Sequence, residues 1–136
     1  MRLNAYLMFN GDCEAAFKLY AQVTGGKIVA MMPYEGSPAS GHAPPEWQKK
    51  IIHARLEVGG DTLMGSDASP GHYNKPQGSS VTLRVDTPEE AERTFKGLSD
   101  GATIQMAMDK TFFAKKFGML VDRFGTHWMV ICENPM

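Results

Sequence analysis

The sequence predicts an α+β fold built from two βαβββ modules. Residues 5–29 align with residues 80–104 at a shift of 75 positions, and the matches recur at the spacing that buries one helix face. Strand-like alternation and turn residues follow each aligned segment. Convergence on good strand–helix packing would give similar matches, so a single unduplicated sheet stays open as the alternative. The matched pairs are Glu14 and Glu89, Ala16 and Ala91, Tyr20 and Phe95, Val23 and Leu98, and Gly26 and Gly101.

The first module begins with a strand that ends in a turn at residues 10–12. Asp12 is expected to accept hydrogen bonds from the free amides of the helix that follows. Apolar residues at positions 16, 19, 20 and 23 form one helical stripe, and Gly25 and Gly26 end it. Alternation after the helix predicts further strands. The expected strands are residues 3–9, 27–32, 50–58 and 62–66.

Two loops separate these elements. Residues 33–47 contain four prolines and two glycines, which predicts a loop long enough to be a lid or a subunit contact. Residues 67–78 form a second proline- and glycine-rich connection. It divides a single domain, residues 1–136, into modules at about residues 1–67 and 79–136.

The second module carries the stronger helix start. Thr87 can cap the helix, Pro88 suits its first position, and Glu90 can complete a capping box. An aromatic-rich segment at residues 110–117 precedes a hairpin that turns at residues 122–125. The expected strands are residues 80–85, 102–106, 118–121 and 127–132.

The composition narrows the possible partners and location. The chain has 136 residues, 43% of them hydrophobic, and a formal charge of -1. It lacks the one-sided positive field that nucleic acid selects, the apolar run of roughly 20 residues that crosses a bilayer, and a secretory signal pattern. We therefore expect a cytoplasmic protein with no nucleic-acid or membrane partner. Cys13 and Cys132 are too few for a disulfide framework.

Five segments give the sequence a specific resemblance that covers nearly the whole chain. They are Tyr6–Gly11 with Cys13–Ala16, Ile52–Leu56, Leu63–Asp67, Thr111–Ala114 and Phe117–Trp128. The sequence resembles the vicinal oxygen chelate superfamily of glyoxalases, ring-cleaving dioxygenases and bleomycin-type antibiotic-resistance proteins, and most closely its PhnB-like branch. The resemblance implies two cupped mixed sheets around a cavity that binds a small molecule, and a homodimer.

The resemblance also implies where metal-using members place their ligands. The corresponding positions here are Ala5, Ser80, Met129 and one residue within 63–65. Hard or borderline divalent ions need several converging imidazole or carboxylate donors, which these residues do not supply. We therefore expect no standard metal site and no other cofactor, while an atypical divalent metal stays open.

The same alignment suggests which residues line the cavity. If Ala5 and Ser80 face it, Tyr6, Met8, Val81 and Leu83 face the helices, and polar residues on the other strands face the cavity. His53 is the candidate catalytic residue, because histidine titrates near neutral pH and can act as acid, base or ligand. A merely hydrogen-bonded or solvent-facing histidine is the alternative. The candidate substrate-binding residues are Arg55, Asp67, Ser80, Thr82, Phe113, Met129 and Glu133.

Two functions stay open from the sequence. One is an enzyme, metal-independent or atypically metallated and of lyase, isomerase or dioxygenase type, with His53 as its acid–base group and Asp67 or Glu133 as its orienting carboxylate. The other is a protein that sequesters a small, partly aromatic compound without chemistry. Methyl transfer finds no support, because no glycine-rich strand-to-helix turn is present to hold a nucleotide-like methyl donor. Most methionines other than Met129 are interpreted as core residues.

Overall fold

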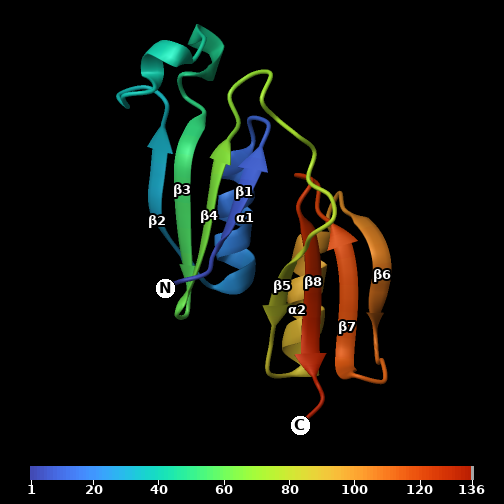
Figure 1. Cartoon of the computed structure of the whole chain (residues 1–136). Coiled ribbons are helices and arrows are strands. Elements are labelled where there is room, and N and C mark those ends of the chain that lie inside the picture. Colours follow the sequence, from blue (N-terminus) through green and yellow to red (C-terminus); the bar gives the residue numbers. More distant parts are fainter. Residues whose placement is uncertain (136) are drawn as a thin grey trace. The chain divides into compact units, whose positions relative to one another are not determined.

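The computed structural model describes residues 1–135 and contains two α-helices and eight strands in two βαβββ runs (Figure 1). Two short 3₁₀ helices, η1 (Ser40–His42) and η2 (Pro45–Trp47), lie in the loop between β2 and β3. The first run consists of β1 (Ala5–Phe9), α1 (Cys13–Thr24), β2 (Lys27–Pro33), β3 (Ile51–Val58) and β4 (Asp61–Asp67). The second consists of β5 (Val81–Arg84), α2 (Pro88–Ser99), β6 (Thr103–Asp109), β7 (Ala114–Val121) and β8 (His127–Glu133). The predicted α+β class and the βαβββ order of both modules are confirmed.

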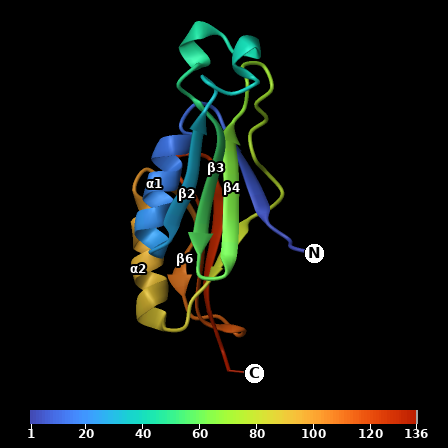
Figure 2. The same cartoon turned by 90° about the vertical axis from the view of Figure 1, so that its left-hand side faces the viewer.

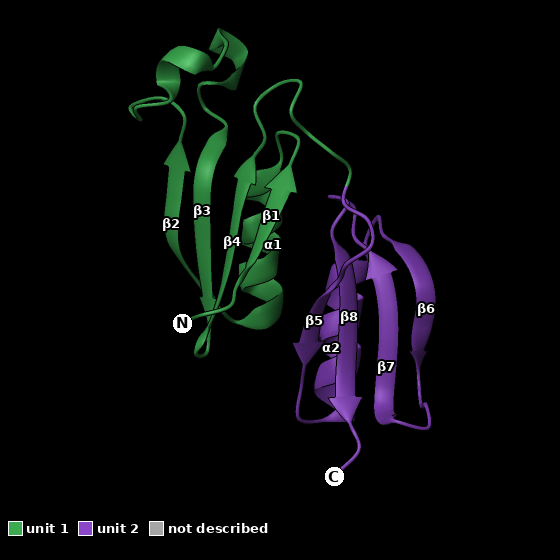
Figure 3. Ribbon diagram, viewed as in Figure 1, with its two compact units in different colours: residues 1–75 green, residues 76–136 purple. Residues whose placement is uncertain are grey.

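Each run forms its own compact unit, unit 1 from residues 1–75 and unit 2 from residues 76–136 (Figure 3). The strand order is β1-β4-β3-β2 in unit 1 and β5-β8-β7-β6 in unit 2. Both sheets are mixed, because the first strand of each unit runs parallel to the last and the other pairs are antiparallel.

In unit 1, α1 covers one face of the sheet (Figure 2). The rings of Phe9, Phe17 and Tyr20 lie 5.9–6.5 Å apart in a fully buried cluster between β1 and α1. Gly65 of β4 lets the Phe17 ring approach, because a Cβ at this glycine would lie 2.7 Å from Cε1 of Phe17. The helix-facing side of the sheet therefore includes Phe9 and Gly65.

In unit 2, α2 covers the corresponding face (Figures 1 and 2). Trp128 and Val130 of β8 and Leu120 of β7 are buried there. A Cβ at Gly118 of β7 would lie 2.7 Å from Cε1 of Phe95 on α2. Each unit thus seats a helix phenylalanine against a sheet glycine, although the two glycines lie on strands that are not equivalent.

The two helices start differently. Thr87 caps α2 as predicted, since its Oγ1 accepts a hydrogen bond from the Glu90 amide at 3.1 Å. The prediction for Asp12 was wrong, because its side chain makes no capping bond to α1. Asp67, at the far end of β4, accepts the Cys13 amide hydrogen instead.

Element bounds agree with the sequence to within a few residues, except at the aromatic-rich segment. β7 begins at Ala114, four residues before the expected start, because Ala114 pairs with Glu133 across the sheet. None of the helices in residues 1–135 is long and apolar enough to span a membrane.

Candidate functional site

The candidate site is the face of unit 1's sheet that α1 does not cover. There the phenol oxygen of Tyr6 lies 3.0 Å from Nδ1 of His53, and the two rings stack with centroids 5.8 Å apart. Tyr6 is on β1 and His53 on β3, with β4 between them. The contact therefore crosses β4, and the positions of both residues are fixed by the hydrogen-bonded strands that carry them.

Burial raises the pKa of the Tyr6 phenol, so the phenol stays protonated at neutral pH. A neutral His53 can pair with it in two ways. In one tautomer the phenol donates to Nδ1 and Nε2 carries the hydrogen. In the other, Nδ1–H donates to the phenol oxygen and Nε2 is left as an acceptor. Among residues 1–135 no other hydrogen bond engages the imidazole, so Nε2 is available to a ligand.

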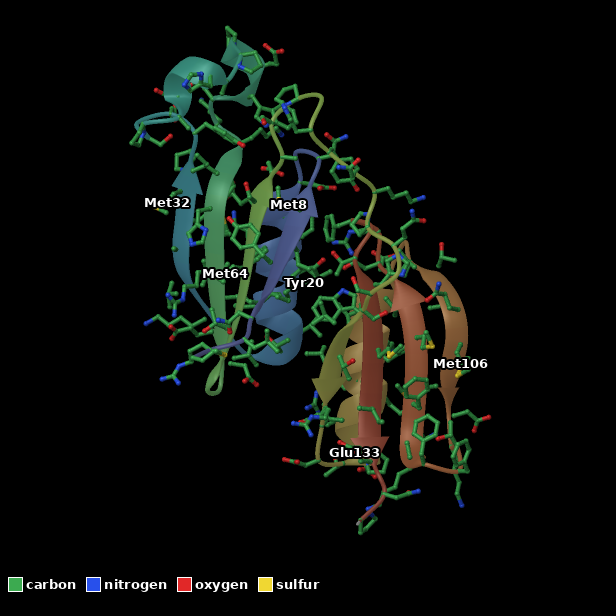
Figure 4. The ribbon with its side chains drawn as sticks, in the orientation of Figure 1. Met8, Tyr20, Met32, Met64, Met106 and Glu133 are labelled. Carbon is green, nitrogen blue, oxygen red and sulfur yellow. The ribbon has the colours of Figure 1, made fainter. Side chains whose placement is uncertain are left out.

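The neighbours of this pair are apolar. Met8 and Met32 are 41% and 48% exposed, and Tyr6 itself is 45% exposed, although large apolar side chains usually avoid water. Figure 4 labels Met8, Met32 and Met64 on β1, β2 and β4 of this unit. Arg55 pairs with Met64 across the sheet, and its guanidinium lies 3.5 Å from the Glu57 carboxylate. The face thus combines adaptable thioethers with one acid–base pair and one cation.

The orientation of β1 corrects the sequence interpretation. Tyr6 and Met8 were expected to face the helix, but Phe9 contacts α1 and Tyr6 reaches His53 on the opposite face. Every residue of β1 is apolar, so alternation alone does not set its phase. The large aromatic residue Phe9, the last before the turn, could have indicated which face of β1 packs against the helix. In unit 2 the predicted phase agrees with the buried side chains of β8.

Asp67, expected near the rim of the site, is 1% exposed. Its Oδ1 accepts the amide hydrogens of Gly11 and Cys13 at 2.8 and 3.0 Å, and its Oδ2 accepts that of Ile51 at 2.9 Å. The Tyr34 hydroxyl donates to its backbone oxygen at 2.7 Å. These bonds give Asp67 a structural role, and its contact with a ligand stays a prediction.

Cys13 is not a reactive thiol. It is fully buried at the start of α1, and burial together with the charge of Asp67 raises its pKa. The thiolate is the nucleophilic form of cysteine, and a raised pKa suppresses it.

The remaining candidate residues belong to unit 2. Thr82 and Met129 are paired neighbours on the face away from α2, and Ser80 comes just before β5. Glu133 lies 3.5 Å from the Arg84 guanidinium. Phe113 lies outside this pairing, with its ring 5.1 Å from those of Phe112 and Phe117. The structure brings Thr82 and Met129 together, and the role of all five candidates in binding stays a prediction.

The superfamily's metal does not fit these residues. With the phase of β1 corrected, the first-strand position in unit 1 moves from Ala5 to Tyr6, which pairs with Met64, while the positions in unit 2 stay at Ser80 and Met129. A phenol, a hydroxyl and two thioethers are poor ligands for a hard divalent ion. Within residues 1–135, no three side chains of His, Cys, Asp or Glu lie close enough together to hold a metal ion.

Comparisons with known proteins extend these observations. A model of the family described as 3-demethylubiquinone-9 3-methyltransferase matches residues 2–131. Protein PA1353 from Pseudomonas aeruginosa is 46% identical, with a TM-score of 0.91 over 99% of both chains. A Bacillus cereus protein, described as a putative 3-demethylubiquinone-9 3-methyltransferase and PhnB protein, is 25% identical, with a TM-score of 0.82 over 97% of this chain and 99% of that one.

A more distant structure shows the same fold. A glyoxalase/bleomycin resistance protein/dioxygenase family enzyme from Burkholderia phytofirmans is 15% identical, with a TM-score of 0.68 over 96% of this chain and 97% of that one. The predicted resemblance to this superfamily and to its PhnB-like branch is confirmed.

Proposed function

Since the chain belongs to the 3-demethylubiquinone-9 3-methyltransferase family, whose PhnB-like members share the glyoxalase fold, we propose that it binds a small organic molecule on the uncovered sheet face of unit 1. The observation that carries the proposal is the contact between Tyr6 and His53. Exposed apolar faces often mark ligand-binding surfaces, and a hydrogen-bonded tyrosine–histidine pair on such a face can orient a ligand and exchange a proton with it.

The chemistry of the face defines the ligand class. Methionine thioethers adapt to irregular apolar shapes, and the Tyr6 ring offers a stacking surface. Nε2 of His53 and the guanidinium of Arg55 can each bind a ligand oxygen. We therefore propose a partly aromatic or unsaturated compound that carries a carbonyl, hydroxyl or carboxylate oxygen.

Binding without chemistry is the primary proposal, and acid–base catalysis is the second candidate. The Tyr6–His53 contact favours the second, because a protonated phenol can donate a hydrogen to Nδ1 or accept one from it as the imidazole changes tautomer. When Nδ1–H donates to the phenol oxygen, Nε2 can take a proton from a carbon beside a ligand carbonyl and return it to a neighbouring carbon. Such a step is an isomerisation and consumes no co-reactant.

Methyl transfer, the activity in the family description, has little support in the residues present. A nucleotide-like methyl donor is commonly held by free amides at a glycine-rich strand-to-helix turn. In unit 1 the amides of Gly11 and Cys13 donate to Asp67, and the Trp47 ring occupies the space beside Gly11, 3.2 Å from where a Cβ would lie. In unit 2 the Glu90 amide donates to Thr87.

Thermal-shift screening of such compounds tests the proposal. A ligand should raise the melting temperature of the wild type, and His53→Ala and Tyr6→Phe should each lose most of that shift. His72→Ala is the matched control, because His72 is another unit 1 histidine but bonds Ser69 of the connecting loop instead of facing the sheet. Equal shifts in all four proteins would refute the proposed site.

Incubation of a bound ligand in D₂O separates the two candidate functions. Catalysed proton transfer would exchange a ligand hydrogen for deuterium, with the rate falling in His53→Ala. A ligand that stays unlabelled in the wild type would leave binding alone as the function.

We also propose the homodimer that the family resemblance implies, with residues 33–47 at the contact. Gln48 braces this loop by donating to the backbone oxygens of Ser40 and Ala43 at 2.8 and 2.7 Å, which gives it a defined surface. Sedimentation velocity should show a dimer, and a monomer at micromolar concentration would refute it.

A further inference from the structure

Three methionines form a row across the sheet of unit 2. Met106 of β6 pairs with Met119 of β7, and Met119 pairs with Met129 of β8. Directly paired residues on neighbouring strands project from the same face of a sheet, with Cβ atoms about 4.5–5.5 Å apart. Met119 and Met129 therefore leave the sheet side by side, and Met106 pairs with Met119 at a point where the pairing of β6 shifts register on both sides.

The neighbours of these methionines show which face carries the row. Gly118 and Leu120, on either side of Met119, face α2, and Trp128 and Val130 do the same on either side of Met129. Because side chains alternate along a strand, Met119 and Met129 lie on the uncovered face. Met106, labelled on β6 in Figure 4, is 46% exposed.

We propose that Met106, Met119 and Met129 bind a soft monovalent metal ion of the Cu(I) type. A thioether is neutral and polarizable, and thioether and thiolate ligands select Cu(I) over hard divalent ions. Methionine is unbranched and has three rotatable bonds, so three of them on adjacent strands can bring their sulfur atoms together. The site goes beyond the ligand-binding function proposed for unit 1, and it uses none of the same residues.

A nitrogen donor is present on the same face. His127 lies two residues before Met129 on β8, and its Nε2 is 3.0 Å from the backbone oxygen of Pro76. A carbonyl oxygen can only accept, so Nε2 carries the hydrogen and the neutral ring has its lone pair on Nδ1. A second ring nitrogen that donates to a carbonyl is typical of histidines that bind metals.

Unit 1 provides the matched control. Met64 occupies the same place in its sheet as Met129, on the last strand next to the first, but its paired neighbours are Tyr6 and Arg55. A guanidinium in place of a second thioether repels a cation. In the described residues, a row of three directly paired thioethers therefore occurs in unit 2 and not in unit 1.

Titration with Ag(I), a redox-stable analogue of Cu(I), tests the site in the full chain labelled with ¹³C-methyl methionine. The methyl resonances of Met106, Met119 and Met129 should shift with one equivalent of ion, while that of Met64 should not. Met119→Leu keeps the side-chain volume and should bind this ion at least about tenfold more weakly, whereas Met64→Leu should bind it as the wild type does.

A second titration with Cu(I), under anaerobic conditions and against a Cu(I) chelator, should show the same dependence on Met119. The proposal is overturned if the ions bind only to the thiols of Cys13 and Cys132, if Cu(I) does not bind, or if Met119→Leu matches the wild type while its near-ultraviolet circular dichroism shows a native fold.

Discussion

The two units start the same helix in different ways. In unit 2 the cap is local, since the Thr87 side chain accepts the amide hydrogen of Glu90, only three residues later in the chain. In unit 1 it comes from Asp67, which is 54 and 56 positions from the amides of Cys13 and Gly11. The start of α1 therefore depends on the completed sheet, whereas the start of α2 is encoded in its own first turn.

Each unit also contains one buried aspartate that uses both of its oxygens, and the same contrast recurs. Asp122 accepts the amides of Phe124 and Thr126 and the indole hydrogen of Trp128, all within six residues. Asp67 joins the β1–α1 turn to the start of β3. A buried carboxylate thus closes a hairpin in unit 2 and connects distant segments in unit 1.

The largest expected effect is that of Asp67→Ala. The substitution leaves three amide hydrogens without their acceptor, two of them in buried bonds, and each unsatisfied buried donor costs about 1–3 kcal/mol. We expect the free energy of unfolding to fall by about 3–5 kcal/mol in urea titrations, with Asp67→Asn between Ala and the wild type.

Thr87→Ala is the matched variant in unit 2. It removes a single exposed capping bond and should cost about 0.5–2 kcal/mol. If the two alanine variants lost equal stability, the distinction between a distant and a local cap would be wrong.

The difference between the caps also explains what the sequence predicted. The 75-residue shift holds for both helices, which span residues 13–24 and 88–99. The cap formed by Thr87 and Glu90 could be recognised in the sequence because the two residues lie within one helical turn. Asp67 was recognisable only as a polar residue after a strand. Its partners are set by tertiary structure, which a local pattern does not contain.

The 75-residue alignment does not hold for the segments before and after each helix, because these segments pack differently in the two units. In unit 1, Phe9 of β1 faces α1. In unit 2, Leu83 of β5 pairs with the buried Val130 and so lies on the helix side of its sheet. These two helix-facing residues, Phe9 and Leu83, are 74 positions apart and not 75. Gly26 and Gly101 align in the sequence, but each glycine is required for a different structural reason. Gly101 adopts a φ of 72°, whereas Gly26 is required because a Cβ there would lie 2.7 Å from the Glu57 backbone oxygen.

The candidate site was partly predictable for a similar reason. His53 stood out as a titratable residue on an alternating strand, but its partner Tyr6 is on β1, where both faces are apolar and the phase is ambiguous. The methionine row was missed because it arises from pairing among three strands.

The glycines beneath the helix phenylalanines should show effects of intermediate size. Gly65→Ala places a Cβ 2.7 Å from Phe17, and Gly118→Ala places one 2.7 Å from Phe95. Overpacking of this kind costs about 1–3 kcal/mol. Thermal unfolding should show that Phe17→Leu restores stability lost in Gly65→Ala, and that Phe95→Leu does so for Gly118→Ala.

Crossed pairs are the control for this prediction. Phe95→Leu should not rescue Gly65→Ala, because the two residues belong to different units. Rescue by either leucine would mean that the glycine contacts are not specific to their own helix.

The smallest effect at neutral pH concerns ionisation, and it also separates the units. All four tyrosines lie in unit 1, and burial raises the pKa of Tyr6, Tyr34 and Tyr73 as well as that of Cys13. The folded unit holds these protons after the unfolded chain has lost them. The stability they contribute is therefore complete below about pH 8.5, the value for an unfolded thiol, and falls as the pH rises past about 10, the value for an unfolded phenol.

In unit 2 the alkaline response should be weaker, because the raised pKa of Lys116 comes from its hydrogen bond with Glu92 in a solvent-screened ion pair. A Trp47→Phe variant leaves Trp128 of unit 2 as the only tryptophan. As the pH rises through this range, tyrosinate absorbance at about 295 nm should appear later than in model peptides and should accompany loss of unit 1 structure, before the fluorescence of Trp128 changes. Tyrosinate that formed near about pH 10, the value for an unfolded phenol, in a fully folded protein would show that burial does not protect these phenols.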